Sequence, residues 1–115
     1  MGVQNDKNKR IVLEQFSQIE FSKSDGGYIL HDLLRDIKFD INDTFFYICQ
    51  QIDGERTLAD IAGKVEIRYG VTEDEAYLSV VSVTKILRKK GLVLVKGSLR
   101  YRFIKLFYNL TGYRY

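Results

Sequence analysis

The hydrophobic and polar positions of this chain change their period near residue 42. Before that point they alternate: in "DIKFDI", Ile37, Phe39 and Ile41 fall on one side and three charged residues fall on the other. "QFSQIEFS" alternates less regularly, and "KSDGG" after it favours a turn because Asp-Gly and Gly-Gly accept positive φ. "YILHDLL" follows this turn and precedes "DIKFDI". The pattern predicts a small antiparallel three-stranded sheet over residues 15–41.

After residue 42 the period is helical. Asn42 or Asp43 is placed to cap a first helix, and Thr57 and Thr72 are placed to cap two more, each with an acid three residues later. "RYG" ends the second helix, and "LVLV" after the third predicts a short strand. The three predicted helices present apolar stripes to a common core: Phe45, Ile48, Cys49 and Ile52; Leu58, Ile61, Ala62 and Val65; Ala76, Val80, Val83 and Leu87.

The resulting fold class is α+β, a winged helix-turn-helix-like arrangement of a three-stranded antiparallel sheet, three helices and a short C-terminal strand. We expect a disordered arm at residues 1–14, one domain at residues 15–97 and a basic aromatic extension at residues 98–115. The extension fits two patterns equally, a hairpin around Lys96-Gly97 or a helix capped by Ser98. It holds six of the chain's 15 aromatic residues.

Composition describes an ordinary globular chain, and its charge is unevenly distributed. The net charge is +3, but residues 1–75 carry nine Lys and Arg against all 15 acids, whereas residues 76–115 carry nine Lys and Arg and no acid. Such an imbalance attracts an anionic partner or neutralises itself across the fold. No signal peptide or apolar stretch of membrane-spanning length is visible, so we expect a cytoplasmic protein.

Residues suited to catalysis are scarce. His31 is the only histidine and Cys49 the only cysteine, too few for a zinc site, and no Gly-rich phosphate loop is present. Cys49 lies on the apolar stripe of a predicted helix and His31 in a predicted strand, positions typical of packing or surface residues. We therefore expect no enzyme activity, no metal and no cofactor.

A winged helix-turn-helix order raises the alternative of a DNA-binding transcriptional regulator. Arg88, Lys89 and Lys90 end the third helix, and "KGSLRYR" could form the wing. However, the third helix opens with "EDE", which repels phosphate, whereas recognition helices usually contact bases near their N-termini. Charge placement makes nucleic acid the less favoured partner.

The predicted sheet offers a different kind of site, because an exposed strand edge is a template for an added peptide strand. If "DIKFDI" forms that edge, a groove between it and the third helix supplies backbone hydrogen bonds on one side and side chains on the other. The predicted peptide-binding residues are Asp36, Ile37, Lys38, Phe39, Asp40, Ile41, Tyr77, Val81, Thr84, Lys85 and Arg88.

The run "FDIND…ICQQIDGERTLADIAGKVEIRYGVTEDEA…VTKILRKKGLV" resembles the pyrroloquinoline quinone biosynthesis protein D (PqqD) family over roughly residues 15–95. The resemblance implies a peptide-recognition element of pathways that modify ribosomally made peptides. Such a protein is a non-catalytic chaperone that binds the leader segment of a precursor peptide by strand addition, against its third helix, and presents it to a modifying enzyme. The extension after Val95 departs from the family pattern, and the chain is expected to be a monomer or a dimer.

Overall fold

The computed structural model describes residues 11–15 and 18–96. These residues form five strands and three helices along the chain. The elements are β1 (Leu13–Gln15), β2 (Ile19–Ser24), β3 (Gly27–Asp32), β4 (Ile37–Ile41), α2 (Asp43–Gln51), α3 (Leu58–Tyr69), α4 (Glu73–Lys89) and β5 (Val93–Val95).

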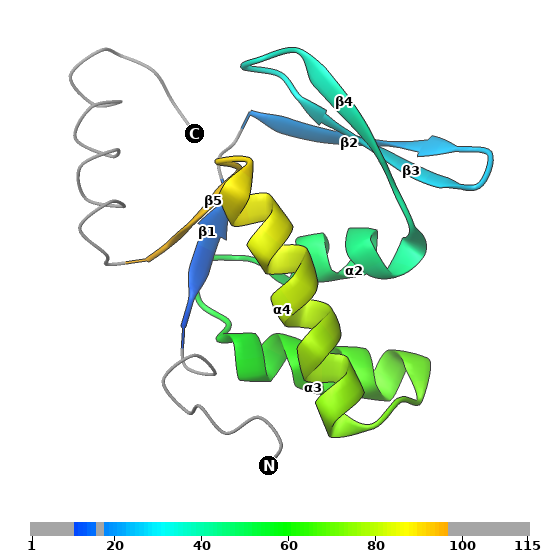
Figure 1. Ribbon diagram of the computed structural model, residues 1–115, viewed down its shortest axis with the longest axis vertical. Coiled ribbons are helices and arrows are strands. Elements are labelled where there is room, and N and C mark those ends of the chain that lie inside the picture. Colours follow the sequence, from blue (N-terminus) through cyan, green and yellow to red (C-terminus); the bar gives the residue numbers. More distant parts are fainter. Residues whose placement is uncertain (1–10, 16–17, 97–115) are drawn as a thin grey trace.

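Two separate sheets flank the helices. An antiparallel sheet in the order β2-β3-β4 lies at one end of the molecule, and β1 pairs with β5 in a second sheet beside α4 (Figure 1). The helix α4 runs diagonally from α3 toward the three-stranded sheet, and its C-terminal end lies near that sheet (Figure 1). The predicted α+β, winged-helix-like fold class is confirmed.

The predicted turn at "DGG" joins β2 to β3. Ser24 pairs with Gly27 across a two-residue loop, and the register continues to Ile19 opposite Asp32. A β-carbon at Gly27 would lie 2.5 Å from the carbonyl oxygen of Ile41, so the neighbouring strand β4 approaches too closely for any side chain there. Glycine at this position therefore allows β4 to pair with β3 along its whole length.

All three predicted helix caps are confirmed. Asn42 accepts a hydrogen bond from the Phe45 amide at 2.8 Å, and capping boxes at Thr57 and Thr72 begin α3 and α4. Gly70 ends α3 with φ of 66°, in the left-handed region that favours glycine. These side chains satisfy the free amides of each first turn, which explains why the helix starts agree with the sequence pattern.

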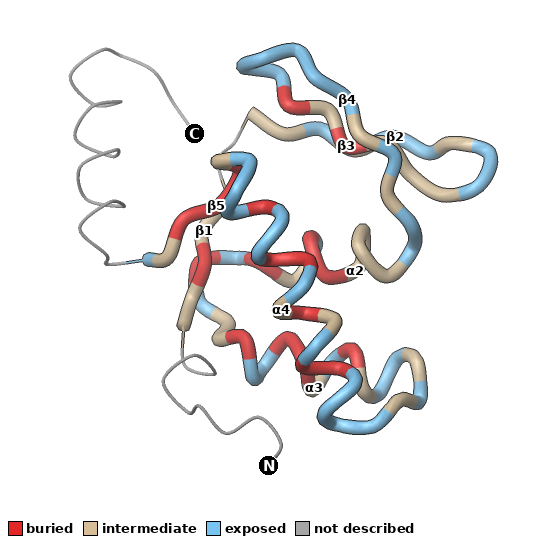
Figure 2. Tube along the Cα trace, viewed as in Figure 1, coloured by how far each residue is buried: buried red, intermediate tan, exposed pale blue. Residues whose placement is uncertain are grey.

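The predicted stripes meet in one core between the three helices. Buried residues line the inner sides of α2, α3 and α4 and continue into β5 (Figure 2). In α4 the burial is wider than predicted, because Tyr77 and Thr84 are only 5% and 3% exposed. Phe45 is half-buried at the edge of this core, toward the sheet.

The N-terminal part of the domain differs from the prediction. Residues 11–14 do not belong to a disordered arm: Leu13 is buried, and residues 13–15 pair with residues 93–95. The three-stranded sheet accordingly begins at Ile19 and not at Gln15. The local pattern missed this strand because its partner β5 pairs Val95 with Leu13 and Val93 with Gln15, far away along the chain. The remainder of the predicted arm and the extension 98–115 lie outside the described residues.

Candidate functional site

The outer edge of β4 is the first component of the site. In the described part of the chain β4 pairs with β3 alone, so its other edge has no strand neighbour. Lys38 and Asp40 have exposed side chains, whereas Phe39 and Ile41 are half-buried and pack against the core. Such an edge presents unpaired amides and carbonyls to an incoming strand.

The hairpin indicates which backbone groups face outward. A two-residue loop makes Ser24 and Gly27 a hydrogen-bonded pair, and such pairs recur at every second position of an antiparallel ladder. We infer that Ile37, Phe39 and Ile41 direct their backbone groups to β3. The amides and carbonyls of Lys38 and Asp40 then face the open edge, ready to pair with an added strand.

An apolar cavity lies between this edge and the C-terminal end of α4. Its volume is about 210 Å³, enough for a large side chain rather than a whole small molecule. The two walls are β4 and α4, and the base is formed by β3, α2 and the segment before β5. The lining residues are Leu30, Phe39, Asp40, Ile41, Phe45, Ile86, Leu87, Lys90 and Leu92.

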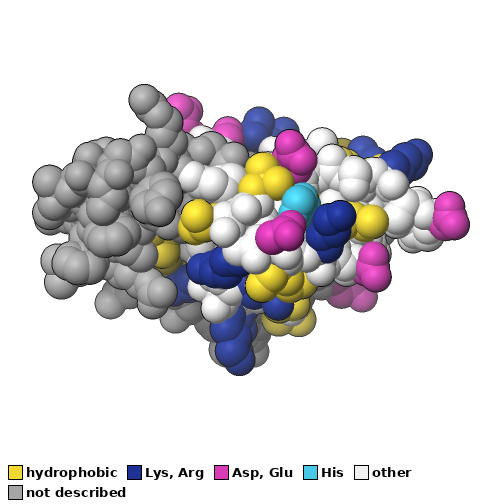
Figure 3. Space-filling view, turned by 90° about the horizontal axis from the view of Figure 1, so that it is seen from above, with side chains coloured by type: hydrophobic (Ala, Val, Ile, Leu, Met, Phe, Trp, Pro, Cys, Tyr) yellow, Lys and Arg dark blue, Asp and Glu magenta, His cyan; other side chains and the backbone are white. Residues whose placement is uncertain are grey.

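Lys90 supplies a positive charge at this cavity. Its ammonium nitrogen lies 4.1 Å from the centroid of the Phe39 ring, so the cation covers the aromatic face that β4 turns toward α4. Figure 3 views the molecule from this end and shows hydrophobic side chains beside Lys and Arg side chains. The cavity thus combines a mainly apolar lining with the positive charge of Lys90.

Arg35 joins the turn after β3 to the end of α4. Its guanidinium Nη1 donates to the Asp32 carboxylate at 2.7 Å and to the Lys90 carbonyl at 2.9 Å. Asp32 is buried, and it also accepts hydrogen bonds from the amides of Leu34 and Arg35. This network connects the turn that precedes β4 with the C-terminal end of α4.

The structure brings together only part of the predicted site. Phe39, Asp40 and Ile41 line the cavity, and Asp36, Ile37 and Lys38 lie on the same loop and strand. The five predicted helix residues do not line it: Tyr77, Val81, Thr84, Lys85 and Arg88. At 3.6 residues per turn, Arg88 lies about 160° round the helix from both Ile86 and Lys90.

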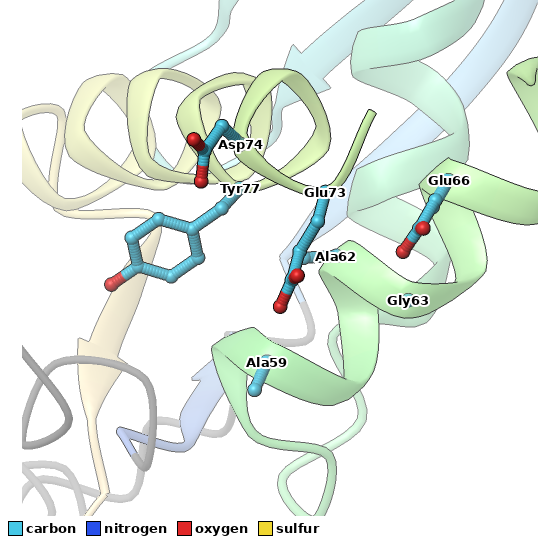
Figure 4. A pocket seen from close by; sticks show the side chains of 7 residues that line it. All are labelled: Ala59, Ala62, Gly63, Glu66, Glu73, Asp74 and Tyr77. Carbon is cyan, nitrogen blue, oxygen red and sulfur yellow. The ribbon is translucent and has the colours of Figure 1, made fainter. Parts of the chain in front are cut away.

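The five predicted helix residues thus lie outside the lining of this cavity, and their part in peptide binding stays a prediction. Tyr77 instead lines a separate cavity of about 80 Å³ between α3 and α4, together with small residues of α3 and the acids Glu66, Glu73 and Asp74 (Figure 4). Sequence reasoning did not assign Leu30, Phe45, Ile86, Leu87, Lys90 or Leu92 to the site, and Ile86 and Lys90 are the two at the end of α4 that it had not placed in the core either. Helical spacing places Ile86 and Lys90 beside the core residues Val83 and Leu87, on the flank of α4 opposite to Thr84 and Arg88. Only the position of β4 shows that this flank faces the sheet.

The remaining reactive side chains are engaged elsewhere. His31 Nε2 lies 2.8 Å from Asp36 Oδ1 on the outer side of the sheet, and burial raises the pKa of the Cys49 thiol to about 12. A thiol with so high a pKa is a poor nucleophile at neutral pH. Among the described residues, no group of three or more His, Cys, Asp or Glu is placed to hold a metal ion, and no helix is long and apolar enough to cross a membrane.

Comparison with known proteins gives one family and two similar structures. Residues 28–93 match the family model described as coenzyme PQQ synthesis protein D (PqqD). No curated protein matches the chain. The structure described as lasso peptide synthetase B1 complexed with the leader peptide is 23% identical, with a TM-score of 0.61, and the match covers 71% of this chain and 96% of that one.

A second structure has the same fold. It is described as TbiB1 in complex with the TbiA(beta) leader peptide, and it is 14% identical with a TM-score of 0.59. The match covers 74% of this chain and 96% of the other. Each match covers almost the whole of the other chain, so this protein shares the arrangement of sheet and helices with both structures.

Proposed function

Because the chain belongs to the coenzyme PQQ synthesis protein D (PqqD) family, matched over residues 28–93, we propose that it binds the leader segment of a ribosomally made precursor peptide. The leader adds as a strand to the open edge of β4, and the protein presents it to a modifying enzyme. In this proposal the chain has no catalytic role of its own and works in the cytoplasm.

The observation that carries the proposal is the unpaired edge of β4 beside an apolar cavity. Strand addition needs an open row of backbone groups for affinity and a pocket for alternate side chains for specificity. Both are present on the same strand. The two structures of the same fold are described as complexes with leader peptides, which makes a leader the expected occupant of this groove.

The bound peptide would pair with the outward backbone groups of Lys38 and Asp40. Its side chains would alternate, one set pointing to solvent and the other into the cavity lined by Phe39, Phe45 and Ile86. The modifying enzyme would then act on the part of the precursor outside the groove. This division of roles requires no reactive group in the binding protein.

A proline substitution tests strand addition directly. Asp40→Pro removes an amide that faces outward, so pairing with β3 should survive while pairing with a peptide is lost. Lys23→Pro is the matched control, because Lys23 is exposed on β2, the other edge strand, and its amide also faces outward by the same alternation. The full chain and both variants would be used to select peptides from a displayed library of random dodecamers.

The expected result is a shared set of enriched peptides for the unchanged chain and Lys23→Pro, and no enrichment for Asp40→Pro. Circular dichroism melts of all three proteins check that the folds are retained. If Asp40→Pro melts like Lys23→Pro and still selects the same peptides, strand addition at β4 is wrong. If the unchanged chain enriches no peptide, the proposed function itself fails.

A further inference from the structure

We propose that Lys90 selects leaders carrying a carboxylate two residues away from the apolar side chain that fills the cavity. This inference rests on the proposed function and adds the chemistry of the peptide that the groove accepts. It concerns a single side chain at the rim, next to the Phe39 ring.

Among the described residues that line the cavity, Lys90 is the only basic one, and no ion pair is found for it within the described part of the chain. The acid in the lining is Asp40, whose neighbour Phe39 points toward the helices, so that the Asp40 side chain points to the other face of β4. The ion pairs found among the described residues join His31 to Asp36, Arg35 to Asp32 and Arg56 to Asp53. The Lys90 ammonium therefore faces the groove with an aromatic ring as its neighbour.

The backbone of Lys90 is fixed, so its side chain starts from a defined position. Its amide donates to the Ile86 carbonyl at 3.0 Å, and its own carbonyl accepts from Arg35 Nη1 at 2.9 Å. Arg35 is in turn paired with the buried carboxylate of Asp32. The backbone of Lys90 is thus anchored and its ammonium group lies over the Phe39 ring. The charge is therefore preorganised for a ligand that binds along β4.

Strand geometry gives the spacing of the ligand's side chains. Alternate residues of an added strand point to the same side and are about 6.5–7 Å apart. When one inward side chain fills the apolar cavity, the next inward side chain reaches the rim where Lys90 lies. A carboxylate there forms a charge-assisted hydrogen bond with the ammonium, whereas a basic side chain is repelled.

Charge reversal at Lys90 tests this pairing with the same library of random dodecamers. The unchanged chain should enrich peptides with an apolar residue and an acid two positions away. Lys90→Glu should enrich Lys or Arg at that second position. Lys85→Glu is the matched control, because Lys85 is exposed on the same helix but does not line the cavity, and it should keep the preference for an acid.

Fluorescence polarisation with a synthetic peptide of the enriched sequence measures how much the acid contributes to affinity. Exchange of its acid for the corresponding amide should weaken binding to the unchanged chain about three- to tenfold, and binding to Lys90→Gln less than about twofold. Lys90→Gln keeps the stem of the side chain, so it remains informative if Lys90→Glu is unstable.

Two results would overturn the inference while the proposed function stands. In one, Lys90→Glu keeps the acid preference; in the other, Lys85→Glu changes it as strongly as Lys90→Glu does. In both cases peptides would still be enriched and Asp40→Pro would still abolish that enrichment. Failure of the proposed function gives a different pattern, with no enrichment by the unchanged chain or with full enrichment by Asp40→Pro.

Discussion

At the scale of single residues, Asp32 is the buried charge on which the groove depends. Only 4% of its side chain is exposed, and it receives hydrogen bonds from two backbone amides and the Arg35 guanidinium. A buried carboxylate is tolerated when its oxygens are all engaged in this way. Through Arg35, this carboxylate also connects the turn between β3 and β4 with the C-terminal end of α4, beside the cavity.

Asp32→Ala should lower the free energy of unfolding by about 1–3 kcal/mol, because the two amides and Arg35 lose their acceptor. Urea denaturation measures the change. Glu20→Ala is the control, since Glu20 is an exposed acid on β2, and it should alter stability by less than about 0.5 kcal/mol. Equal effects of the two substitutions would contradict the role of Asp32.

Cys49 links stability to pH. Burial raises the pKa of its thiol from the usual 9.0 to about 12, so the unfolded chain loses the proton near pH 9 while the folded chain keeps it. The unfolded state then binds fewer protons, and the free energy of unfolding falls as pH rises between these values. The loss at pH 10 relative to pH 7 should be about 1.4 kcal/mol.

Urea denaturation at pH 7, 9 and 10 checks this expectation when the unchanged chain is compared with Cys49→Ala. Other groups titrate in both proteins, so the difference between the two pH profiles isolates the thiol. Between pH 7 and pH 10, the free energy of unfolding should fall by about 1.4 kcal/mol less in Cys49→Ala than in the unchanged chain. Parallel profiles would show that the Cys49 thiol ionises equally well in the folded and unfolded chains.

At the scale of elements, local chemistry sets where the helices begin. Thr72 Oγ1 accepts from the Glu75 amide at 3.2 Å, and the Glu75 carboxylate accepts from the Thr72 amide at 3.1 Å. The signal is contained in four consecutive residues, so the sequence alone was sufficient to place it. The same holds for the alternation in β4, which correctly places Phe39 and Ile41 toward the core.

Thr72→Ala should destabilise the protein by about 1 kcal/mol, because the first turn of α4 loses the acceptor for an otherwise free amide. Thr72→Ser keeps a hydroxyl and should be close to neutral. Thermal and urea denaturation of the two variants measure the difference. A serine variant as unstable as the alanine variant would indicate that the threonine methyl group, and not the cap, is responsible.

The sequence pattern of α4 by itself does not show which flank of the helix faces the sheet. Helical periodicity identifies the residues that face the core and leaves two flanks, one with Thr84 and Arg88 and the other with Ile86 and Lys90. Which flank meets the sheet depends on the path of the chain between β4 and α4. Lys85 and Arg88, predicted as part of the groove wall, are for this reason better used as controls in binding experiments.

At the scale of the whole molecule, charge separates two kinds of partner. Glu73, Asp74 and Glu75 are exposed at the start of α4, the end of the helix that would meet DNA bases in a winged helix-turn-helix protein. The basic residues Arg88, Lys89 and Lys90 are at the opposite end of α4, and Lys90 lines the groove. This distribution favours a peptide along β4 over duplex DNA along α4.

Salt dependence distinguishes these partners. Between 50 and 200 mM salt, the affinity for a peptide selected from the library should change less than about threefold, since backbone pairing and the apolar cavity contribute most of it and one ion pair contributes little. A DNA complex with six phosphate contacts would weaken by about 10³ over the same range. Fluorescence polarisation with the labelled peptide and with a labelled DNA duplex measures both affinities. Tight duplex binding that weakens strongly with salt would contradict the proposal that the partner is a peptide.

The sequence by itself determined the features that depend on near neighbours: the caps, the three helices, the alternation of β4, the α+β class and the family. The tertiary structure decided the pairing of β1 with β5, the flank of α4 that faces β4, and the Arg35 bridge from Asp32 to Lys90. The reason is physical. Periodicity and capping come from contacts within a few residues, whereas pairing and groove walls come from segments that meet only when the core closes.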